Sequence, residues 1–142
     1  MTPTQIKLVQ DSFAKVAPIS EQAAALFYGR LFEIAPEVKP MFKGDMKEQG
    51  RKLMATLVVV VNGLSNLNSI LPAASMLAKR HVTYGVTAGH YATVGTALLW
   101  TLERGLGPQQ WTQDTATAWA AAYTTLSQYM IGEAYGRPAA AE

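Results

Sequence analysis

The chain has 142 residues, of which 49% are hydrophobic, and a formal net charge of +2 at pH 7. This length fits one domain whose core could enclose a small cofactor, and the apolar content excludes a disordered tail protein. The sequence contains no cysteine, which excludes disulfide scaffolds, zinc ribbons and thiol catalysis. The 12 Lys and Arg residues are scattered in runs no longer than two, so we expect no nucleic-acid partner.

The sequence predicts neither a secretory signal nor a membrane partner. Residues 1–7 lack a charged segment followed by an apolar core. The apolar run from Leu57 to Val61 is far too short to cross a bilayer. We therefore expect a cytoplasmic protein that is a monomer or a weak homo-oligomer.

Apolar residues recur at spacings of three and four along the chain, whereas alternation of period two is nearly absent. This periodicity is typical of amphipathic helices, so we predict an all-α fold. Proline and glycine residues divide the chain into segments of unequal length, which is unlike an up-and-down bundle. The predicted helices span about residues 3–17, 20–35, 36–40, 46–62, 72–84, 88–104 and 112–134.

Capping patterns predict where two of these helices begin. Thr2 with Gln5, and Asp45 with Glu48, each have the spacing of a capping box, in which two side chains satisfy the first free amides of a helix. At the other end of the chain, we expect residues 135–142 to form a loose tail.

One histidine lies on the apolar face of a predicted helix. Pro72 is expected to begin this helix and Gly85 to cap its end, and His81 shares a face with Leu77 one turn earlier. In a chain with two histidines and no cysteine, such an imidazole is either a hydrogen-bonded core residue or an axial ligand to haem iron. The other histidine, His90, is expected to be structural or partly exposed.

Four further residues could line a pocket. Phe42 follows a proline-rich corner, where a large aromatic ring needs a surface to pack against. Gln49 and Leu53 are one turn apart on one helix and can face the same space. Tyr28 lies on the apolar face of the second helix. Taken singly, Tyr28 could equally be a core tyrosine and Gln49 a solvated residue of a first helical turn.

Four segments together resemble the haem domain of bacterial flavohaemoglobins and bacterial single-domain globins, including those of methanotrophs. The resemblance runs from about residue 5 to residue 134. Each motif is short, and the specificity comes from their order and spacing. The segments are L-F-Y-G-R-L-F at 26–32, E-V-K-P-M-F at 37–42, Q-G-R-K-L at 49–53 and L-A-K-R-H at 77–81.

This resemblance implies a single globin domain over residues 1–142, with a core from about 3 to 134. The implied architecture is a three-over-three helical sandwich that encloses haem b. Residue by residue, the resemblance implies a proximal iron ligand, a distal ligand-binding side and a set of haem-packing residues. These are His81 as the ligand, Tyr28, Gln49 and Leu53 on the distal side, and Phe42, Leu77 and Val94 against the haem.

The resemblance also raises a question about the proximal side. In flavohaemoglobins, a tyrosine and a glutamate behind the proximal histidine bond to it and favour peroxidase and dioxygenase chemistry. Tyr91 matches that tyrosine. Glu133 lies one position before the aligned place, which Ala134 takes. Glu133 is therefore either part of this network or a surface carboxylate near a helix end.

Two arginines could pair with haem propionates, because a guanidinium suits a carboxylate. Arg80 is next to His81 in the sequence, and Arg51 lies on the predicted distal helix. Solvated surface charge is the alternative for each.

The resemblance implies a haem protein that binds dioxygen reversibly at a pentacoordinate iron, also open to nitric oxide and carbon monoxide. The alternative is a nitric oxide dioxygenase that works with a separate reductase, with weak peroxidase activity as a further enzymatic interpretation. A sensor would need an output module or partner surface, which the sequence does not show. A plain helical adaptor domain is the interpretation without haem.

Overall fold

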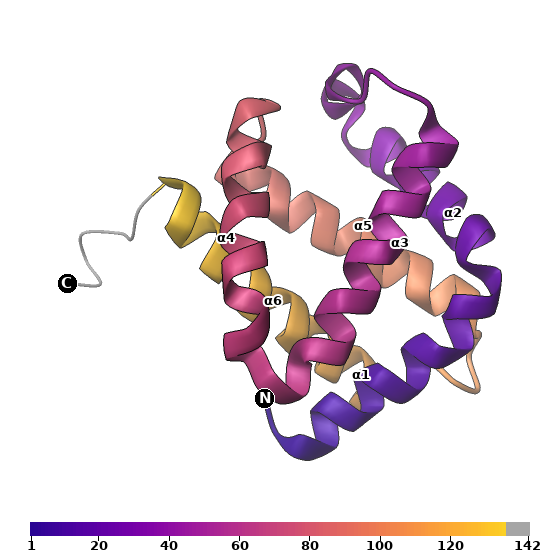
Figure 1. Cartoon of the computed structure of the whole chain (residues 1–142). Coiled ribbons are helices and arrows are strands. Elements are labelled where there is room, and N and C mark those ends of the chain that lie inside the picture. The colour runs from indigo at the N-terminus through magenta and orange to yellow at the C-terminus, as the bar shows by residue number, and fades with distance from the viewer. Residues whose placement is uncertain (136–142) are drawn as a thin grey trace.

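The computed structural model describes residues 1–135, apart from the side chain of Thr83, and within this part every regular element is a helix (Figure 1). The predicted all-α fold is confirmed. Short 3-10 helices at Ala17–Ile19, Pro36–Met41 and Leu64–Asn66 connect the first four α-helices. The α-helices are α1 (Pro3–Val16), α2 (Ser20–Ile34), α3 (Met46–Gly63), α4 (Leu67–Thr83), α5 (Ala88–Leu106) and α6 (Gln113–Tyr135).

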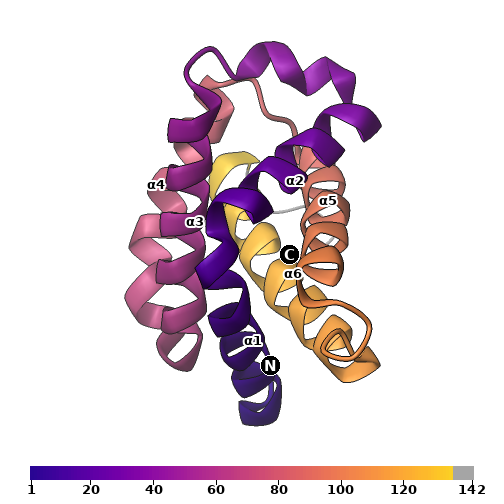
Figure 2. The same cartoon turned by 90° about the vertical axis from the view of Figure 1, so that its right-hand side faces the viewer.

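The helices pack in two layers, which Figure 2 shows from the side. Helices α1, α3 and α4 form one layer, and α2, α5 and α6 form the other. Across the layers, α1 and α4 both contact α6, and α3 contacts α2. The largest fully buried side chains lie between the layers: Val9, Val16, Leu31 and Leu102.

A second, smaller apolar cluster joins α4, α5 and α6. Its buried members are Ala74 and Ala78 from α4, Tyr91 from α5 and Met130 from α6. Helix α4 is therefore held against α6 close to the turn that carries His81, since Ala78 precedes that residue by three positions.

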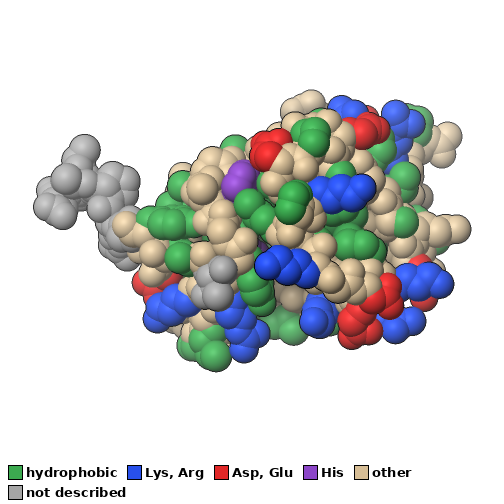
Figure 3. Space-filling model, turned by 90° about the horizontal axis from the view of Figure 1, so that it is seen from above, with side chains coloured by type: hydrophobic (Ala, Val, Ile, Leu, Met, Phe, Trp, Pro, Cys, Tyr) green, Lys and Arg blue, Asp and Glu red, His purple; other side chains and the backbone are tan. Residues whose placement is uncertain are grey.

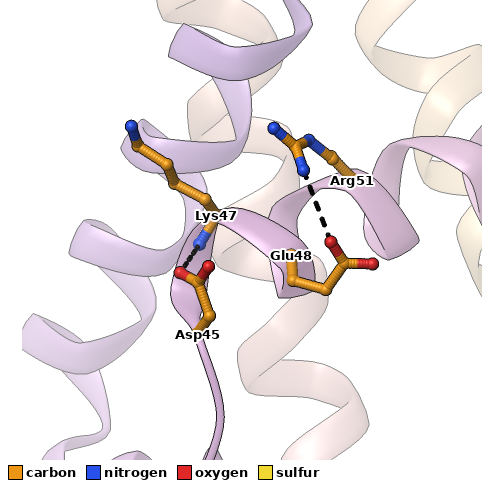
Figure 4. Close-up of polar contacts among 4 residues, drawn as sticks. All are labelled: Asp45, Lys47, Glu48 and Arg51. Carbon is orange, nitrogen blue, oxygen red and sulfur yellow. Dashed lines mark hydrogen bonds and ion pairs between the residues drawn. The ribbon is translucent and has the colours of Figure 1, made fainter.

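One predicted capping box forms and the other does not. The Thr2 hydroxyl accepts from the Gln5 amide at 3.1 Å, and the Thr2 amide donates to the Gln5 side chain at 3.1 Å. Asp45 does cap α3, accepting from the Lys47 amide at 2.9 Å. Glu48 does not complete this second box, because its carboxylate lies 3.4 Å from Arg51 Nη1, one turn further along (Figure 4).

The prediction that Pro72 begins a helix is wrong. Helix α4 begins at Leu67, and Pro72 lies inside its second turn. Burial explains the earlier start: the Ile70 side chain is 6% exposed and packs on Gly63, where an added Cβ would lie 2.2 Å from Ile70 Cγ2. This close approach of α3 and α4 orders the chain as helix before the proline.

Helix α6 extends further than predicted. Tyr135, expected in a loose tail, is the last residue of α6, and its hydroxyl donates to the carbonyl of Val86 just before α5. The rest of the predicted tail, 136–142, lies outside the described residues.

Helices α3 and α4 form a V that is joined at Leu64–Asn66 (Figure 1). By length and composition alone, the described stretch Met46–Val82 is apolar enough to cross a membrane, with 22% of its most apolar window buried. The bend divides this stretch into two arms that pack on other helices, α3 on α2 and α4 on α6. The free ends of the V are the start of α3, which carries Gln49, and the end of α4, which carries His81.

Candidate functional site

His81 lies in the last turn of α4, and its ring is oriented by its own helix. Its Nδ1 is 2.7 Å from the carbonyl oxygen of Leu77. Since a carbonyl only accepts, Nδ1 carries the proton and the lone pair of Nε2 is left for another partner. The side chain is half-buried, and burial lowers its pKa below the ordinary value although the bond to Leu77 acts in the opposite direction. The imidazole is therefore a neutral nitrogen donor, which metal ligation requires.

Aromatic rings from the following segment pack beside His81. The Tyr91 ring on α5 is nearly parallel to it, with 6.2 Å between centroids and 24° between planes. The Tyr84 ring lies 6.1 Å away at 50°. The backbone closes around the histidine as well, because the Val86 amide donates to the His81 carbonyl at 3.0 Å.

Tyr28 on α2 is 7% exposed, and the Gln49 side chain of α3 is near enough to affect its pKa. Burial raises the pKa of Tyr28 above the ordinary value, and the Gln49 side chain acts in the opposite direction with a smaller effect. The phenol therefore stays protonated, and its hydroxyl can donate a hydrogen bond.

Phe42 connects Tyr28 to the corner after α2. Its ring meets Tyr28 edge-to-face at 5.3 Å and 69°, and meets Phe32 at 5.5 Å and 61°. Edge-to-face contacts of this kind stabilise aromatic pairs by about 0.5–1.5 kcal/mol beyond area burial. The start of α3 is therefore placed against α2 by an aromatic cluster.

The remaining predicted packing residues are half-buried. Leu53 and Val94 pack against the main core, and Leu77 packs against the smaller cluster that contains Tyr91. The structure thus brings together Tyr28, Gln49 and Phe42 in one group and places His81, Leu77 and Tyr91 in another.

Glu133 belongs to neither group. Its carboxylate is exposed, accepts from Ser75 Oγ at 2.7 Å and accepts from the Tyr129 hydroxyl at 3.3 Å. The Tyr91 hydroxyl is buried and has no hydrogen-bond partner among the described residues. The described partners of the Glu133 carboxylate are therefore Ser75 and Tyr129.

The two predicted propionate partners are both exposed. Arg51 pairs with Glu48 at 3.4 Å across solvent-exposed side chains, a contact worth under about 1 kcal/mol. Arg80 lies in the last turn of α4. Figure 3 shows the face of the molecule that is seen from above Figure 1. Hydrophobic side chains gather in the middle of that face, and several Lys and Arg side chains lie around them.

The sequence interpretation missed how His90 is used. Its Nδ1 accepts from the Thr87 amide at 3.0 Å, so this histidine caps α5. The signal was present, because Thr87 and His90 have the three-residue spacing of a capping pair. His90 is half-buried, as expected.

The buried phenols predict a loss of stability in alkali. Burial raises the pKa of Tyr28, Tyr91 and Tyr123 in the folded protein. In the unfolded chain, tyrosines lose their protons near pH 10. The stability that the buried phenols contribute is therefore fully present below about pH 10, and the free energy of unfolding falls as the pH rises towards the pKa values of the folded protein. We expect urea unfolding to show lower stability at about pH 11 than at about pH 8, and Tyr28→Phe to reduce the difference. Equal stability at both pH values, with the fold intact, would contradict this prediction.

The donor set fits haem. Among residues 1–135, no three His, Cys, Asp or Glu side chains come together as a metal cage. A porphyrin supplies four in-plane nitrogens itself and needs a single neutral imidazole from the protein. His81, with its Nδ1 proton held by Leu77, has the second contact that orients such a ligand.

Comparisons with known proteins agree with this chemistry. The globin family model matches residues 25–130. The flavohemoprotein of Vibrio cholerae is 29% identical over 134 residues, covering 92% of this chain and 34% of that protein. The flavohemoprotein of Bordetella parapertussis is 30% identical over 135 residues, covering 93% and 33%. The chain thus spans about a third of the length of these relatives.

Two solved structures share the fold over nearly their whole length. A bacterial globin from Campylobacter jejuni has a TM-score of 0.82 and 29% identity, covering 94% of this chain and 96% of that one. An engineered carbene transferase from Rhodothermus marinus, described as a candidate nitric oxide dioxygenase, has a TM-score of 0.84 and 25% identity, covering 94% and 93%. Globins bind haem and diatomic gases such as dioxygen. On the family match over residues 25–130 and these two structures, the chain belongs to the globin family.

Proposed function

We propose that this globin binds haem b through Nε2 of His81 and binds dioxygen reversibly beside Tyr28 and Gln49. The observation that carries the proposal is the orientation of His81, whose Nδ1 is committed to the Leu77 carbonyl at 2.7 Å. Haem held by His81 would supply an iron that takes up dioxygen, nitric oxide or carbon monoxide. The protein's part would be to orient the imidazole and to provide hydrogen-bond donors for the ligand.

Tyr28 and Gln49 supply these donors. An O–H or N–H directed at a bound ligand that carries partial negative charge would slow the release of that ligand. Because burial raises the pKa of Tyr28, the phenol keeps its proton and can donate it in a hydrogen bond to the ligand. Each such bond contributes on the order of 1 kcal/mol.

The proximal side favours reversible binding over oxidative chemistry. A carboxylate bonded to the imidazole would draw its proton away and increase electron density on the metal. In this chain the partner of Nδ1 is a neutral carbonyl, and the Glu133 carboxylate bonds to Ser75 and Tyr129 instead.

Nitric oxide dioxygenation with a separate reductase is the second candidate. The similarity to the Rhodothermus marinus protein favours it, and the Tyr28–Gln49 pair suits it equally well. Weak peroxidase activity would follow from the same haem.

Tyr28→Phe tests the distal proposal. Removing one hydrogen bond of about 1.4 kcal/mol should speed dioxygen dissociation about tenfold, measured by stopped flow. Thr125→Val, which removes an exposed hydroxyl on α6 that bonds to the Ala121 carbonyl of the same helix, should leave the rate unchanged. If Tyr28→Phe leaves dissociation as it was, Tyr28 does not contact the ligand.

A paired measurement separates the two candidates. Dioxygen release is measured first, and nitric oxide consumption is then followed with an efficient reductase supplied in excess. We expect reversible oxygenation with little turnover. Rapid, sustained conversion of nitric oxide to nitrate would establish the dioxygenase instead.

A further inference from the structure

Tyr123 of α6 makes a direct hydrogen bond to the backbone of α5 at Tyr91. Its hydroxyl donates to the Tyr91 carbonyl oxygen at 2.5 Å. The ring is half-buried, and burial raises the pKa of Tyr123, which keeps the phenol protonated and able to donate. The contact joins residues 32 positions apart in the chain, so it depends on how α6 packs against α5.

Gly95 makes room for this contact. It lies one turn after Tyr91, and a Cβ at this position would lie 2.7 Å from Tyr123 Cε2 and 2.9 Å from Cδ2. No side chain can occupy position 95 while the ring stays where it is. Glycine inside a helix costs about 0.5–1 kcal/mol relative to alanine, so its presence in the middle of α5 is explained by the close approach of the Tyr123 ring.

The Tyr91 ring lies beside the His81 ring. The Tyr91 ring stacks beside the His81 ring at 6.2 Å and 24°. The Tyr91 hydroxyl has no hydrogen-bond partner among the described residues, so its side chain is not anchored at the far end by a polar contact there. The position of the ring is set by apolar packing and by the backbone, and Tyr123 bonds to that backbone at Tyr91 itself.

We infer that Tyr123 is a positioning residue for His81, acting through the backbone and ring of Tyr91, and that Gly95 is the residue that permits it. The Leu77 carbonyl of α4 orients the His81 ring directly. Tyr123 of α6 acts on the same ring through Tyr91 of α5. The spectroscopic effect on bound haem rests on the proposed function, in which His81 is the iron ligand. The positioning itself is a property of the protein without haem.

The first test uses the haem-free protein. The chain has only two histidines, so the ring protons of His81 and His90 can be assigned by NMR with a His90→Gln variant. Tyr123→Phe keeps the ring and removes the hydroxyl. We expect the His81 resonances to shift because the Tyr91 ring beside it moves. Unchanged His81 resonances would overturn the inference.

The second test uses the haem complex. Tyr123→Phe should shift the iron–histidine stretching band in resonance Raman spectra. The control Thr125→Val removes an exposed hydroxyl that bonds to the Ala121 carbonyl of the same helix, and it should leave the band unchanged. An identical band in Tyr123→Phe and the unsubstituted protein would overturn the inference. If no variant binds haem, the proposed function fails, and the haem-free measurement still decides whether Tyr123 positions His81.

Gly95→Ala provides an independent variant. The added methyl must displace the Tyr123 ring, so the same His81 resonances should shift. In a Tyr123→Leu background the ring that clashes is absent, and Gly95→Ala should then cause a smaller additional shift. Equal shifts from Gly95→Ala in both backgrounds would show that the two residues act separately, which contradicts the inference.

Discussion

Replacing His81 by glycine is expected to abolish haem retention. The substitution removes the nitrogen that the Leu77 carbonyl holds in a single tautomer, and no cluster of other ligating side chains is found in residues 1–135 to replace it. We expect affinity to fall by at least about 100-fold, which corresponds to about 2.8 kcal/mol. The measurement is the Soret absorbance that remains after gel filtration of the reconstituted protein.

Two controls make the His81 result specific. His90→Ala removes the other imidazole, which caps α5 by accepting from Thr87, and should leave the Soret band in place. Added imidazole should restore part of the band in His81→Gly by supplying the missing nitrogen. A Soret band of normal position and intensity in His81→Gly, without imidazole, would show that another residue is the iron ligand.

Trp119→Ala is expected to lower the free energy of unfolding by about 3–5 kcal/mol. Trp119 is 3% exposed and packs against Phe13 at 6.2 Å. Its indole Nε1 donates to Ser12 Oγ at 2.8 Å, which joins α6 to α1. Removing the ring leaves a cavity between these helices, and the expected loss is a large fraction of the stability of a domain this size.

Urea unfolding followed by circular dichroism measures this loss. Trp119→Phe keeps most of the ring volume and should cost less than Trp119→Ala, because Ser12 Oγ still bonds to the Leu8 and Val9 carbonyls. Trp111→Ala, at a partly exposed position, should also cost less. Equal stability of Trp119→Ala and the unsubstituted protein would show that the contacts of the indole between α1 and α6 do not contribute to the free energy of unfolding.

Local patterns predicted most of the helices correctly. The Thr2–Gln5 box, the cap at Asp45 and the helical periodicity depend on residues within one or two turns, so they can be read from the sequence. The two errors at helix starts have longer-range or competing causes. Ile70 packs on Gly63 across the α3–α4 junction, and Glu48 turns to Arg51 instead of the helix start.

The candidate site also contains both kinds of contact, those within one helix and those between helices. The bond from His81 to Leu77 is a contact within one helical turn, and the spacing of the two residues made it foreseeable. Tyr28 and Gln49 lie on different helices, α2 and α3, and only the resemblance to globins implied that both line one side of the site. The bond of Glu133 to Ser75 could not be predicted from the sequence, because it depends on how α6 packs against α4.

The sequence by itself determined that this chain is helical, that His81 shares an apolar face with Leu77, and that its motifs resemble those of globins. These properties follow from residue type and spacing along the chain. The tertiary structure decided that Glu133 bonds to Ser75 and that Tyr123 bonds to Tyr91 across the space left by Gly95. Such contacts join residues more than 30 positions apart, and their geometry exists only once α4, α5 and α6 have packed together.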